Sequence, residues 1–246
     1  MKGFFITATD TETGKTVITG AIAAALRNRG MQVGVVKPVA SGGTAGAGGR
    51  LQSEDALFLM QAAGMEARDY STVNFVCLKP ALTPAVAAAE SGIAIDMAAV
   101  IAQCRSAGAR YDTVLVEGVG GIMAPLWQDY LVADMIEELK LPLIIVANPR
   151  LGAINHTVLT ANYAKQRGFP VAGIIINQWR EESAGLLERS NIAYIKRLTG
   201  LPVLGLFPFA AGVSVPQRKT ESLAGLAEQH LSISDLLCRM EGLKRE

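Results

Sequence analysis

The sequence predicts an α/β fold in which helices flank a mostly parallel sheet on both faces. Short runs of β-branched and aromatic residues alternate with longer segments of helical periodicity from one end of the chain to the other. These short runs are almost continuously apolar, which indicates strands that are buried on both faces. The chain has 246 residues, of which 50% are hydrophobic and 18% charged, so we expect one globular domain over residues 1–246.

Six runs are expected to form the strands of this sheet. They are residues 3–7, 32–37, 112–116, 141–147, 171–177 and 203–207. Since parallel strands need a crossover between them, the helical segments should lie between successive runs.

Two helices are expected from periodicity and from their end signals. Apolar residues recur at helical spacing over residues 17–26, and Gly30 follows where a left-handed residue would end the helix. Residues 153–167 are followed in the same way by Gly168. Further helices are expected at residues 57–63 and 95–107.

Residues 42–49 are the one flexible-looking stretch, because five of these eight residues are glycine. We find no internal repeat and no linker that would divide the chain. The stretch lies next to the expected active edge of the sheet, so we predict a mobile lid rather than a tether between domains.

Composition excludes several classes of partner. Lysine plus arginine (23) nearly equals aspartate plus glutamate (22), and the net charge of +1 predicts no nucleic-acid partner and no membrane surface. The three cysteines, at positions 77, 104 and 238, are far apart and have no CxxC spacing. This pattern argues against disulfides and thiolate metal sites, and the N-terminus lacks signal-peptide features, so we expect a cytoplasmic protein.

A phosphate-binding loop is predicted at residues 9–16, which read TDTETGKT between a strand and a helix. In such a loop backbone N–H groups surround the phosphates, the lysine bridges the terminal phosphates, and the last hydroxyl binds Mg²⁺. Gly14, Lys15 and Thr16 supply these parts, although the strict pattern requires glycine where Thr9 stands. Because a lysine in the first helical turn opposes the helix dipole unless an anion is bound, we expect a P-loop NTPase-like fold.

Two acidic residues are candidate Mg²⁺ ligands. Glu117 directly follows the apolar run 113–116 and precedes a glycine-rich turn, at the edge where open α/β sheets bind ligands. Asp55 lies in the first turn of an expected helix, where a solvated capping role is common. Spacing alone does not exclude its neighbour Glu54.

Lys37 is a further candidate because it ends the second strand and Pro38 holds it extended. Its ammonium should therefore project from the same sheet edge as the phosphate loop. The alternative is a solvated surface lysine.

Three separated segments resemble the dethiobiotin synthetase family. They are residues 9–16, 37–42 and 116–121, which occur in the family's order. Residues 150–157, 172–177 and 204–208 are also similar to family segments, so the resemblance extends from residue 4 to about residue 208. Ala8 departs from the glycine that is usual in the family.

The resemblance implies a set of site residues. It implies Mg²⁺ bound by Thr16, Asp55 and Glu117, and catalytic roles for Lys37, Lys15 and Thr11. It implies nucleotide contacts from Glu12, Thr13, Gly14, Lys15, Thr16 and Thr19, with Asn177 and Pro208 beside the adenine. It implies substrate contacts from Thr11, Lys37, Ser41 and Gly118. It also implies a homodimer in which the partner's helix start completes the substrate site through Gly152, Ala153, Ile154 and Asn155.

The activity that the resemblance implies is an ATP-dependent cyclo-ligase of biotin biosynthesis. It would form the ureido ring of dethiobiotin from 7,8-diaminononanoate and CO₂, giving ADP and phosphate. One amine would capture CO₂ as a carbamate, which ATP would activate as a carbamoyl phosphate for attack by the second amine. No protein nucleophile is required.

Two other function classes remain open. A ParA/MinD-like regulatory ATPase would usually carry a lysine near the start of the loop, where this chain has Asp10. A related ATP-dependent amide ligase would usually carry an added glutaminase domain, for which 246 residues leave no room, but length alone does not exclude stand-alone relatives of this class. A GTPase is disfavoured because no NKxD motif follows a strand.

Overall fold

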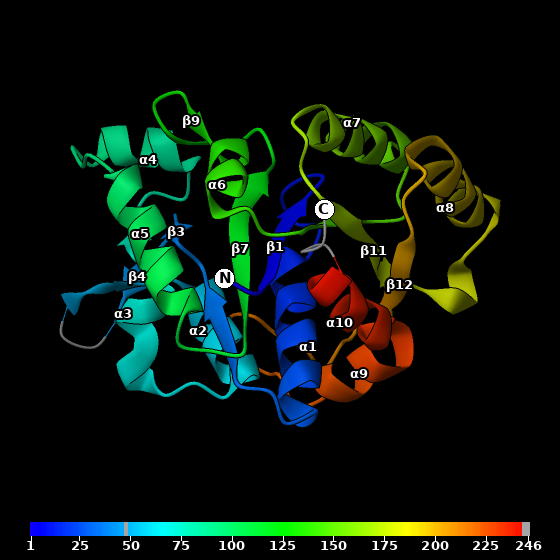
Figure 1. The fold of residues 1–246 in the computed structure, drawn as a ribbon, viewed down its shortest axis with the longest axis horizontal. Coiled ribbons are helices and arrows are strands. Elements are labelled where there is room, and N and C mark those ends of the chain that lie inside the picture. The colour runs from blue at the N-terminus through cyan, green and yellow to red at the C-terminus, as the bar shows by residue number, and fades with distance from the viewer. Residues whose placement is uncertain (47–48, 243–246) are drawn as a thin grey trace.

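The computed structural model describes residues 1–46 and 49–242, and its centre is a six-stranded parallel sheet (Figure 1). The strand order is β12-β11-β10-β1-β7-β2. The strands are β1 (Gly3–Ala8), β2 (Val33–Val36), β7 (Thr113–Gly121), β10 (Leu143–Ala147), β11 (Val171–Trp179) and β12 (Val203–Pro208). Each predicted run forms one of these strands, and the predicted fold class is confirmed.

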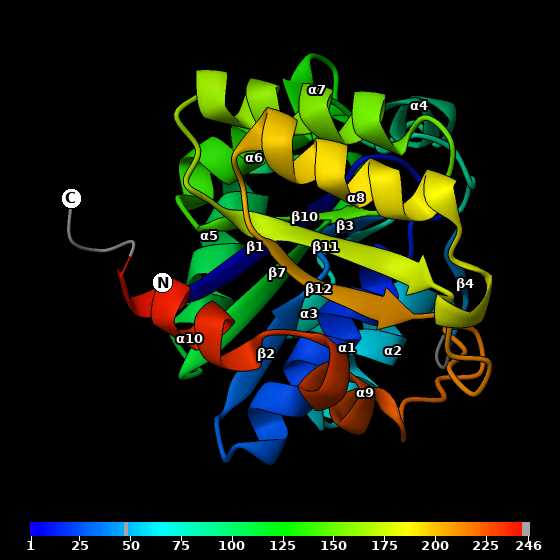
Figure 2. The same ribbon diagram turned by 90° about the vertical axis from the view of Figure 1, so that its right-hand side faces the viewer.

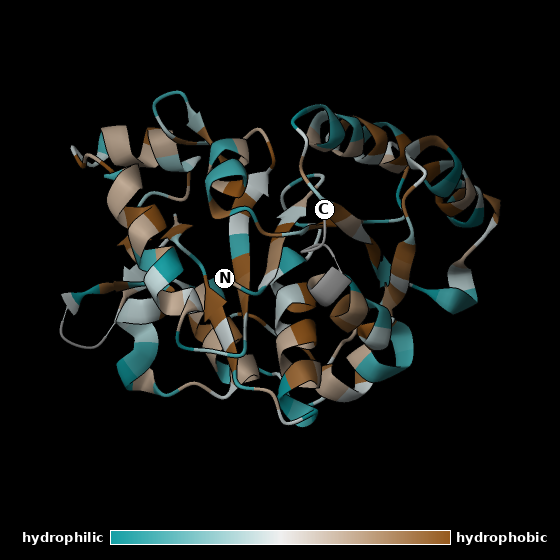
Figure 3. Ribbon diagram, viewed as in Figure 1, coloured by the Kyte–Doolittle hydropathy of each residue, from teal (hydrophilic) through white to brown (hydrophobic). Residues whose placement is uncertain are grey.

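Helices cover both faces of the sheet (Figure 2). On one face lie α1 (Lys15–Asn28), α2 (Glu54–Ala63), α9 (Leu223–His230) and α10 (Ile233–Gly242). On the other lie α4 (Pro84–Glu90), α5 (Met97–Gly108), α6 (Val132–Leu139), α7 (Ala153–Gln166) and α8 (Leu186–Thr199). A short helix, α3 (Tyr70–Val73), follows α2. Figure 3 shows mostly hydrophobic strands between helices that carry hydrophilic residues.

Two apolar cores result, one on each face, because neighbouring side chains of a strand point in opposite directions. In β1, Phe4 and Ile6 pack into the core under α1, while Phe5 between them packs into the core under α5 and α6. All three side chains are fully buried. The nearly continuous apolar runs of the sequence follow from this burial on both faces.

Two predicted helix ends are seen in the structure, and two helices begin earlier than predicted. Gly30 (φ 81°) and Gly168 (φ 72°) both adopt left-handed conformations after α1 and α7. Helix α1 begins at Lys15 rather than at residue 17. Helix α2 begins at Glu54 rather than at residue 57, because Ser53 accepts a hydrogen bond from the backbone N–H of Ala56 (3.3 Å).

Three two-stranded elements lie outside the main sheet. They are β3 (Val39–Ala40) with β6 (Val76–Cys77), β4 (Thr44–Ala45) with β5 (Leu51–Gln52), and β8 (Pro125–Trp127) with β9 (Tyr130–Leu131). The predicted lid at residues 42–49 falls partly in β4, whereas residues 47 and 48 lie outside the described residues. Its role as a lid stays a prediction.

The carboxyl ends of all six strands meet at one edge of the sheet, because the strands are parallel. Residues 9–14, Lys37 and the segment after β11 therefore lie at this edge. Glu117 lies within β7, which continues through the expected glycine-rich turn to Gly121, and it is next to Lys37 because Val116 pairs with Val36. Within the described part of the chain, no helix has the length and apolar character needed to cross a membrane.

Candidate functional site

The phosphate loop joins β1 to α1, and its last residue is Gly14 (φ 78°). A Cβ at Gly14 would lie 2.0 Å from Nδ2 of Asn177, so this position requires glycine for both its backbone angle and its space. Nδ2 of Asn177 donates a hydrogen bond to the carbonyl of Thr13 (2.8 Å). Asn177 therefore ties the loop to β11.

Other hydrogen bonds fix the shape of the loop from both sides. The N–H of Thr9 donates to the carbonyl of Val146 in β10 (3.0 Å), and the Thr13 hydroxyl donates to the carbonyl of Asp10 (3.1 Å). Nε2 of Gln178 donates to the carbonyl of Glu12 (3.2 Å), whose backbone is left-handed (φ 58°). Helix α1 then begins without a side-chain cap. Its first N–H groups therefore face an anion-binding position.

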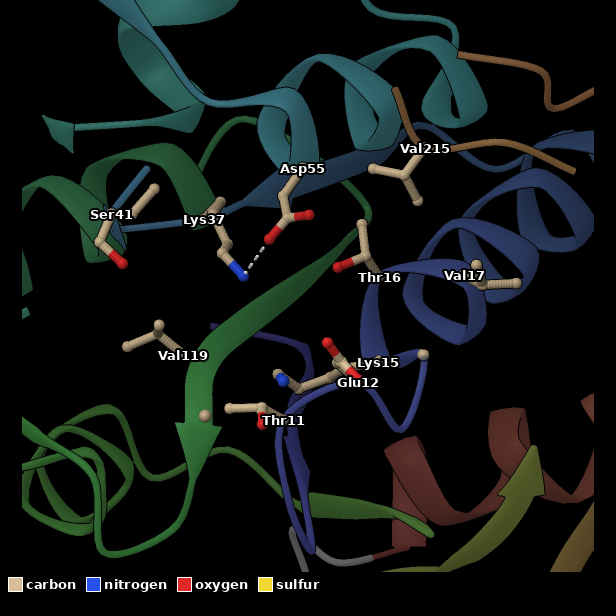
Figure 4. A pocket seen from close by; sticks show the side chains of 13 residues that line it. Thr11, Glu12, Lys15, Thr16, Val17, Lys37, Ser41, Asp55, Val119 and Val215 are labelled. Atoms are coloured by element: carbon tan, nitrogen blue, oxygen red, sulfur yellow. Dashed lines mark ion pairs between the residues drawn. The ribbon is translucent and has the colours of Figure 1, made fainter. Parts of the chain in front are cut away.

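An ion cluster lies beside the loop, in which the buried Lys37 contacts the buried Glu117 and the partly exposed Asp55. Figure 4 shows the pair that Lys37 forms with Asp55. Nζ of Lys37 lies 2.6 Å from Oε1 of Glu117 and 2.8 Å from Oδ2 of Asp55. Lys37 is 3% exposed and Glu117 is 0% exposed. The Thr16 hydroxyl donates to the same Oε1 of Glu117 (2.8 Å), so the cluster is joined to the phosphate loop. Asp55, not Glu54, is the acidic residue of α2 in this cluster.

Lys37 and Asp55 both keep their charges at neutral pH. Burial opposes protonation of Lys37, but the attraction of Asp55 and Glu117 outweighs burial and raises the pKa of Lys37. Burial likewise opposes ionisation of Asp55, and Lys37 outweighs it and lowers the pKa of Asp55. Burial, with the nearby charge of Lys37, lowers the pKa of Lys15 to about 8. Lys15 is thus the cation that most needs an anionic ligand.

The residues fit a Mg²⁺ ion bound together with a nucleotide. Oε2 of Glu117 is buried and has no hydrogen-bond partner among the described residues. A buried carboxylate oxygen without a partner is costly, and a hard cation would satisfy it. In the described ranges, no group of three or more His, Cys, Asp or Glu side chains could hold a metal alone. This donor set suits Mg²⁺, which usually keeps waters and nucleotide phosphates among its ligands.

A cavity of about 320 Å³, the phosphate cavity, opens over the loop and the ion cluster. Eight predicted site residues line it: Thr11, Glu12, Gly14, Lys15, Thr16, Lys37, Ser41 and Asp55. Sequence reasoning did not name as site residues the other five that line it: Val17, Ala40, Val119, Gly120 and Val215. Val215 comes from the segment after β12, and nothing in its sequence indicates the site.

Other predicted residues lie outside the lining of this cavity. The Thr19 hydroxyl donates to the carbonyl of Lys15 within α1 (2.9 Å). Gly118 packs against Phe5, and its carbonyl accepts a hydrogen bond from Nζ of Lys37 (3.2 Å). Pro208 ends β12.

Residues 152–155 are the remaining predicted group, and they form the start of α7. Gly152 is left-handed (φ 90°), and α7 begins without a side-chain cap. Among the described residues, none of this group lines the phosphate cavity or the adjoining cavity of about 470 Å³.

Two further cavities lie around the phosphate cavity. One of about 470 Å³ shares four lining residues with it: Thr11, Ser41, Val119 and Gly120. Its other lining residues include Asp10 of the predicted phosphate loop, and Leu82 and Pro84, which have no sequence signature. The second, of about 280 Å³, is lined by Gln178, Arg180 and Phe209, among others. The Arg180 guanidinium stacks 4.0 Å from the centre of the Phe209 ring.

Comparison with known proteins identifies relatives along almost the whole chain. A family model described as an AAA domain matches residues 2–217. The "ATP-dependent dethiobiotin synthetase BioD" of Bacillus subtilis (strain 168) is 38% identical over 237 residues, which are 96% of this chain and 98% of the relative. The protein of the same name from Bacillus cereus (strain B4264) is 40% identical over 236 residues, covering 96% and 93%.

Solved structures of other proteins have a similar fold. The MinC:MinD cell division complex of Aquifex aeolicus matches with a TM-score of 0.56 at 14% identity, covering 100% of this chain and 96% of that one. A ParA family ATPase from Chlorobium tepidum TLS matches with a TM-score of 0.53 at 16% identity, covering 99% and 98%. At these identities the likeness shows the fold alone.

We predict that Gly14→Ala weakens binding of a non-hydrolysable ATP analogue by roughly 10- to 100-fold, which is about 1.4 to 2.7 kcal/mol. The added Cβ must displace Asn177 and so distort the loop. Gly30→Ala is a matched control, because Gly30 has a similar φ of 81° but nothing within 4 Å of an added Cβ. Calorimetric titration measures both affinities. Equal affinities of the two variants would contradict the role assigned to Gly14.

Proposed function

This chain belongs to the family of ATP-dependent dethiobiotin synthetases, and we propose that its phosphate cavity closes a ureido ring on 7,8-diaminononanoate with CO₂. The protein is an ATP-dependent ligase that forms dethiobiotin in biotin biosynthesis. The observation that best supports the site assignment is the ion cluster of Lys37, Glu117 and Asp55 beside the phosphate loop. ADP and phosphate are the proposed by-products.

In the proposed complex the loop holds the triphosphate of ATP. The N–H groups at the start of α1 bind phosphate oxygens, and Lys15 bridges the terminal phosphates. The adenine lies beside Asn177 and Pro208. The cavity of about 280 Å³ supports this placement. It is lined by Gln178, which directly follows Asn177, and by Phe209, which directly follows Pro208.

Thr16, Asp55 and Glu117 would hold Mg²⁺. The bound ion would supply positive charge to the β- and γ-phosphates. The support for this set is the unpartnered Oε2 of Glu117 together with the Thr16 hydroxyl on the same carboxylate.

Bond making proceeds on the substrates, without a protein nucleophile. The nitrogen of one amine attacks CO₂ and loses a proton, giving a carbamate. A carbamate oxygen then attacks the γ-phosphorus, and ADP leaves with the electron pair of the broken P–O bond. The second amine attacks the carbamoyl carbon and loses a proton, and phosphate leaves with the electron pair of the C–O bond.

The chain's own contribution is positioning and charge. Carbamate and γ-phosphate are both anionic, so bringing them together costs energy that nearby cations offset. Lys15 comes from the loop side and Lys37 from the β2 side of the same cavity. The hydroxyls of Thr11 and Ser41 are positioned to hold the amine end of the substrate.

The 470 Å³ cavity beside the loop suits the aliphatic chain of the substrate. Its lining combines apolar Leu82, Pro84 and Ala124 with hydroxyls of Thr11 and Ser41 at the side that it shares with the phosphate cavity. In the proposed complex the diamine would react beside these two hydroxyls, and its methylene chain would extend along the apolar residues, although Thr9, Asp10 and Thr83 also line the cavity.

We further propose a homodimer in which α7 of the partner receives the substrate carboxylate. Apolar side chains are exposed on and beside α7 and α8: Leu151 (85%), Leu159 (61%), Leu186 (88%), Leu187 (42%), Tyr194 (44%) and Leu198 (51%). Such a concentration supports an interface between copies. The uncapped helix start at residues 152–155 offers N–H groups for a carboxylate.

We predict that phosphate release from ATP requires both the diamine and bicarbonate, and that Lys37→Ala lowers this rate by roughly 100-fold or more, because charge stabilisation of this kind contributes that much. Coupled phosphate assays and mass detection of dethiobiotin measure the two steps. Lys37→Arg, which retains the charge, should retain more activity. A wild-type rate for Lys37→Ala would remove the lysine from the mechanism.

Stimulation of phosphate release by DNA or protein instead of the diamine would support a ParA/MinD-like ATPase.

We predict that Glu117→Gln raises the Mg²⁺ concentration needed for half-maximal turnover by roughly tenfold or more, since ligand loss weakens the site by more than about 1.4 kcal/mol. The neutral amide keeps the shape of Glu117 but loses its charge. Glu54→Gln, on the exposed neighbour of Asp55, is the control and should leave the titration unchanged. An unchanged metal titration for Glu117→Gln would remove this residue from the site.

We predict that Leu159→Asp converts the protein to a monomer and raises the KM for the diamine, because the partner's helix start is lost. Ile93→Asp, at an exposed apolar residue after α4, is the control. Sedimentation velocity gives the oligomeric state. A monomeric wild type with full activity would contradict the proposed shared site.

A further inference from the structure

Lys37 and Asp55 reach the site from different elements, Lys37 directly after β2 and Asp55 from the first turn of α2. Two polar residues that do not line the phosphate cavity connect the backbone at Lys37 to the start of α2. Tyr70 begins α3, and Asn74 follows its last residue. The Tyr70 hydroxyl donates a hydrogen bond to Oδ1 of Asn74 (3.0 Å).

Asn74 holds the backbone of Lys37. Its Nδ2 donates to the carbonyl of Lys37 (2.7 Å) and to that of Val76 (3.2 Å), and the residue is buried. The N–H of Lys37 donates in turn to the carbonyl of Val73 (2.8 Å). Both backbone polar groups of Lys37 are therefore fixed by residues 73 and 74.

Tyr70 holds the start of α2. Its hydroxyl accepts a hydrogen bond from the N–H of Ser53 (2.8 Å), the N-cap residue two positions before Asp55. Burial raises the pKa of Tyr70 to about 12, so the phenol keeps its proton and donates to Asn74 while it accepts from Ser53. One hydrogen-bonded chain thus runs from Ser53 through Tyr70 and Asn74 to Lys37.

We propose that Tyr70 and Asn74 are positioning residues that set the Lys37 ammonium and the Asp55 carboxylate against each other at the reacting phosphate. The proposal deepens the proposed function and rests on it. Neither residue lines the phosphate cavity, so both act through Lys37 and Asp55. A displacement of about 1 Å at such groups can reduce a rate by roughly 100-fold.

The phosphate loop provides a way to separate positioning from general stability. The loop is held by Val146, Asn177 and Gln178, which belong to β10 and β11 and not to the Tyr70–Asn74 chain. Loss of Tyr70 or Asn74 contacts should therefore leave ATP binding at saturating Mg²⁺ unchanged. The step that depends on Lys37, and the Mg²⁺ dependence that depends on Asp55, should change.

Tyr70→Phe and Asn74→Asp test the proposal in the full-length enzyme. Tyr70→Phe removes one hydroxyl, and Asn74→Asp replaces the donor to the Lys37 carbonyl by an acceptor. Tyr163→Phe in α7 is the matched control. It also removes a hydroxyl that takes part in a hydrogen bond, the one that it accepts from Arg167 (2.9 Å). Circular dichroism and Tm establish that each variant is folded.

We expect kcat of Tyr70→Phe and Asn74→Asp to fall by roughly 10- to 100-fold. The KM for ATP should stay within about twofold of wild type, and the half-saturating Mg²⁺ concentration for binding a fluorescent ATP analogue should rise. A purely structural role would instead lower Tm and the active fraction without moving the Mg²⁺ titration. The Mg²⁺ titration is a binding measurement, so it reports even where turnover is too slow to measure.

A double-mutant cycle with Lys37→Ala completes the test. At saturating Mg²⁺, where the effect through Asp55 is removed, Tyr70→Phe should change kcat by less than about twofold in the Lys37→Ala background, because its remaining effect passes through Lys37. Fully additive effects, or folded Tyr70→Phe and Asn74→Asp enzymes with wild-type kcat and Mg²⁺ titration, would overturn the proposal. If Lys37→Ala itself had a wild-type rate, the proposed role of Lys37 would fail and not this positioning alone.

Discussion

The site depends on one electrostatic constraint: a buried lysine must lie between two carboxylates. Removing one member of such a buried pair costs about 3–5 kcal/mol, because the other charge is left uncompensated. The parallel register meets the constraint directly. Val36 of β2 pairs with Val116 of β7, so the next residues, Lys37 and Glu117, emerge side by side at the carboxyl edge. Asp55 closes the cluster from α2, and Thr16 connects it to the phosphate loop.

Much of the fold and part of the site could be predicted from sequence, because those parts depend on local pattern. Continuous apolar runs predicted the strands, and the GKT sequence between a strand and a helix predicted the phosphate loop. Lys37 and Glu117 were expected at the same edge of the sheet as the phosphate loop, but their direct ion pair was not predicted, since it requires the strand order β1-β7-β2. The choice between Glu54 and Asp55 required the position of the Ser53 cap.

Other parts of the site have no local signature. Asn177 was expected beside the adenine. In the structure its side chain donates the hydrogen bond that anchors the phosphate loop. Val215, Leu82 and Pro84 reach the cavities from segments whose composition indicates nothing about ligands. Tertiary packing alone brings them there. The fold is shared with MinD and ParA proteins at 14–16% identity, so function must be argued from the site and the close relatives.

The central claim is that this ion cluster is where the terminal phosphate of ATP is handled. The most direct measurement is a crystal structure with Mg²⁺, a non-hydrolysable ATP analogue and the diamine. The account predicts metal density against Oε2 of Glu117 and the Thr16 hydroxyl, with Nζ of Lys37 in contact with the γ-phosphate or the reacting amine. A triphosphate bound away from Lys37, with Oε2 of Glu117 still lacking a partner, would contradict it.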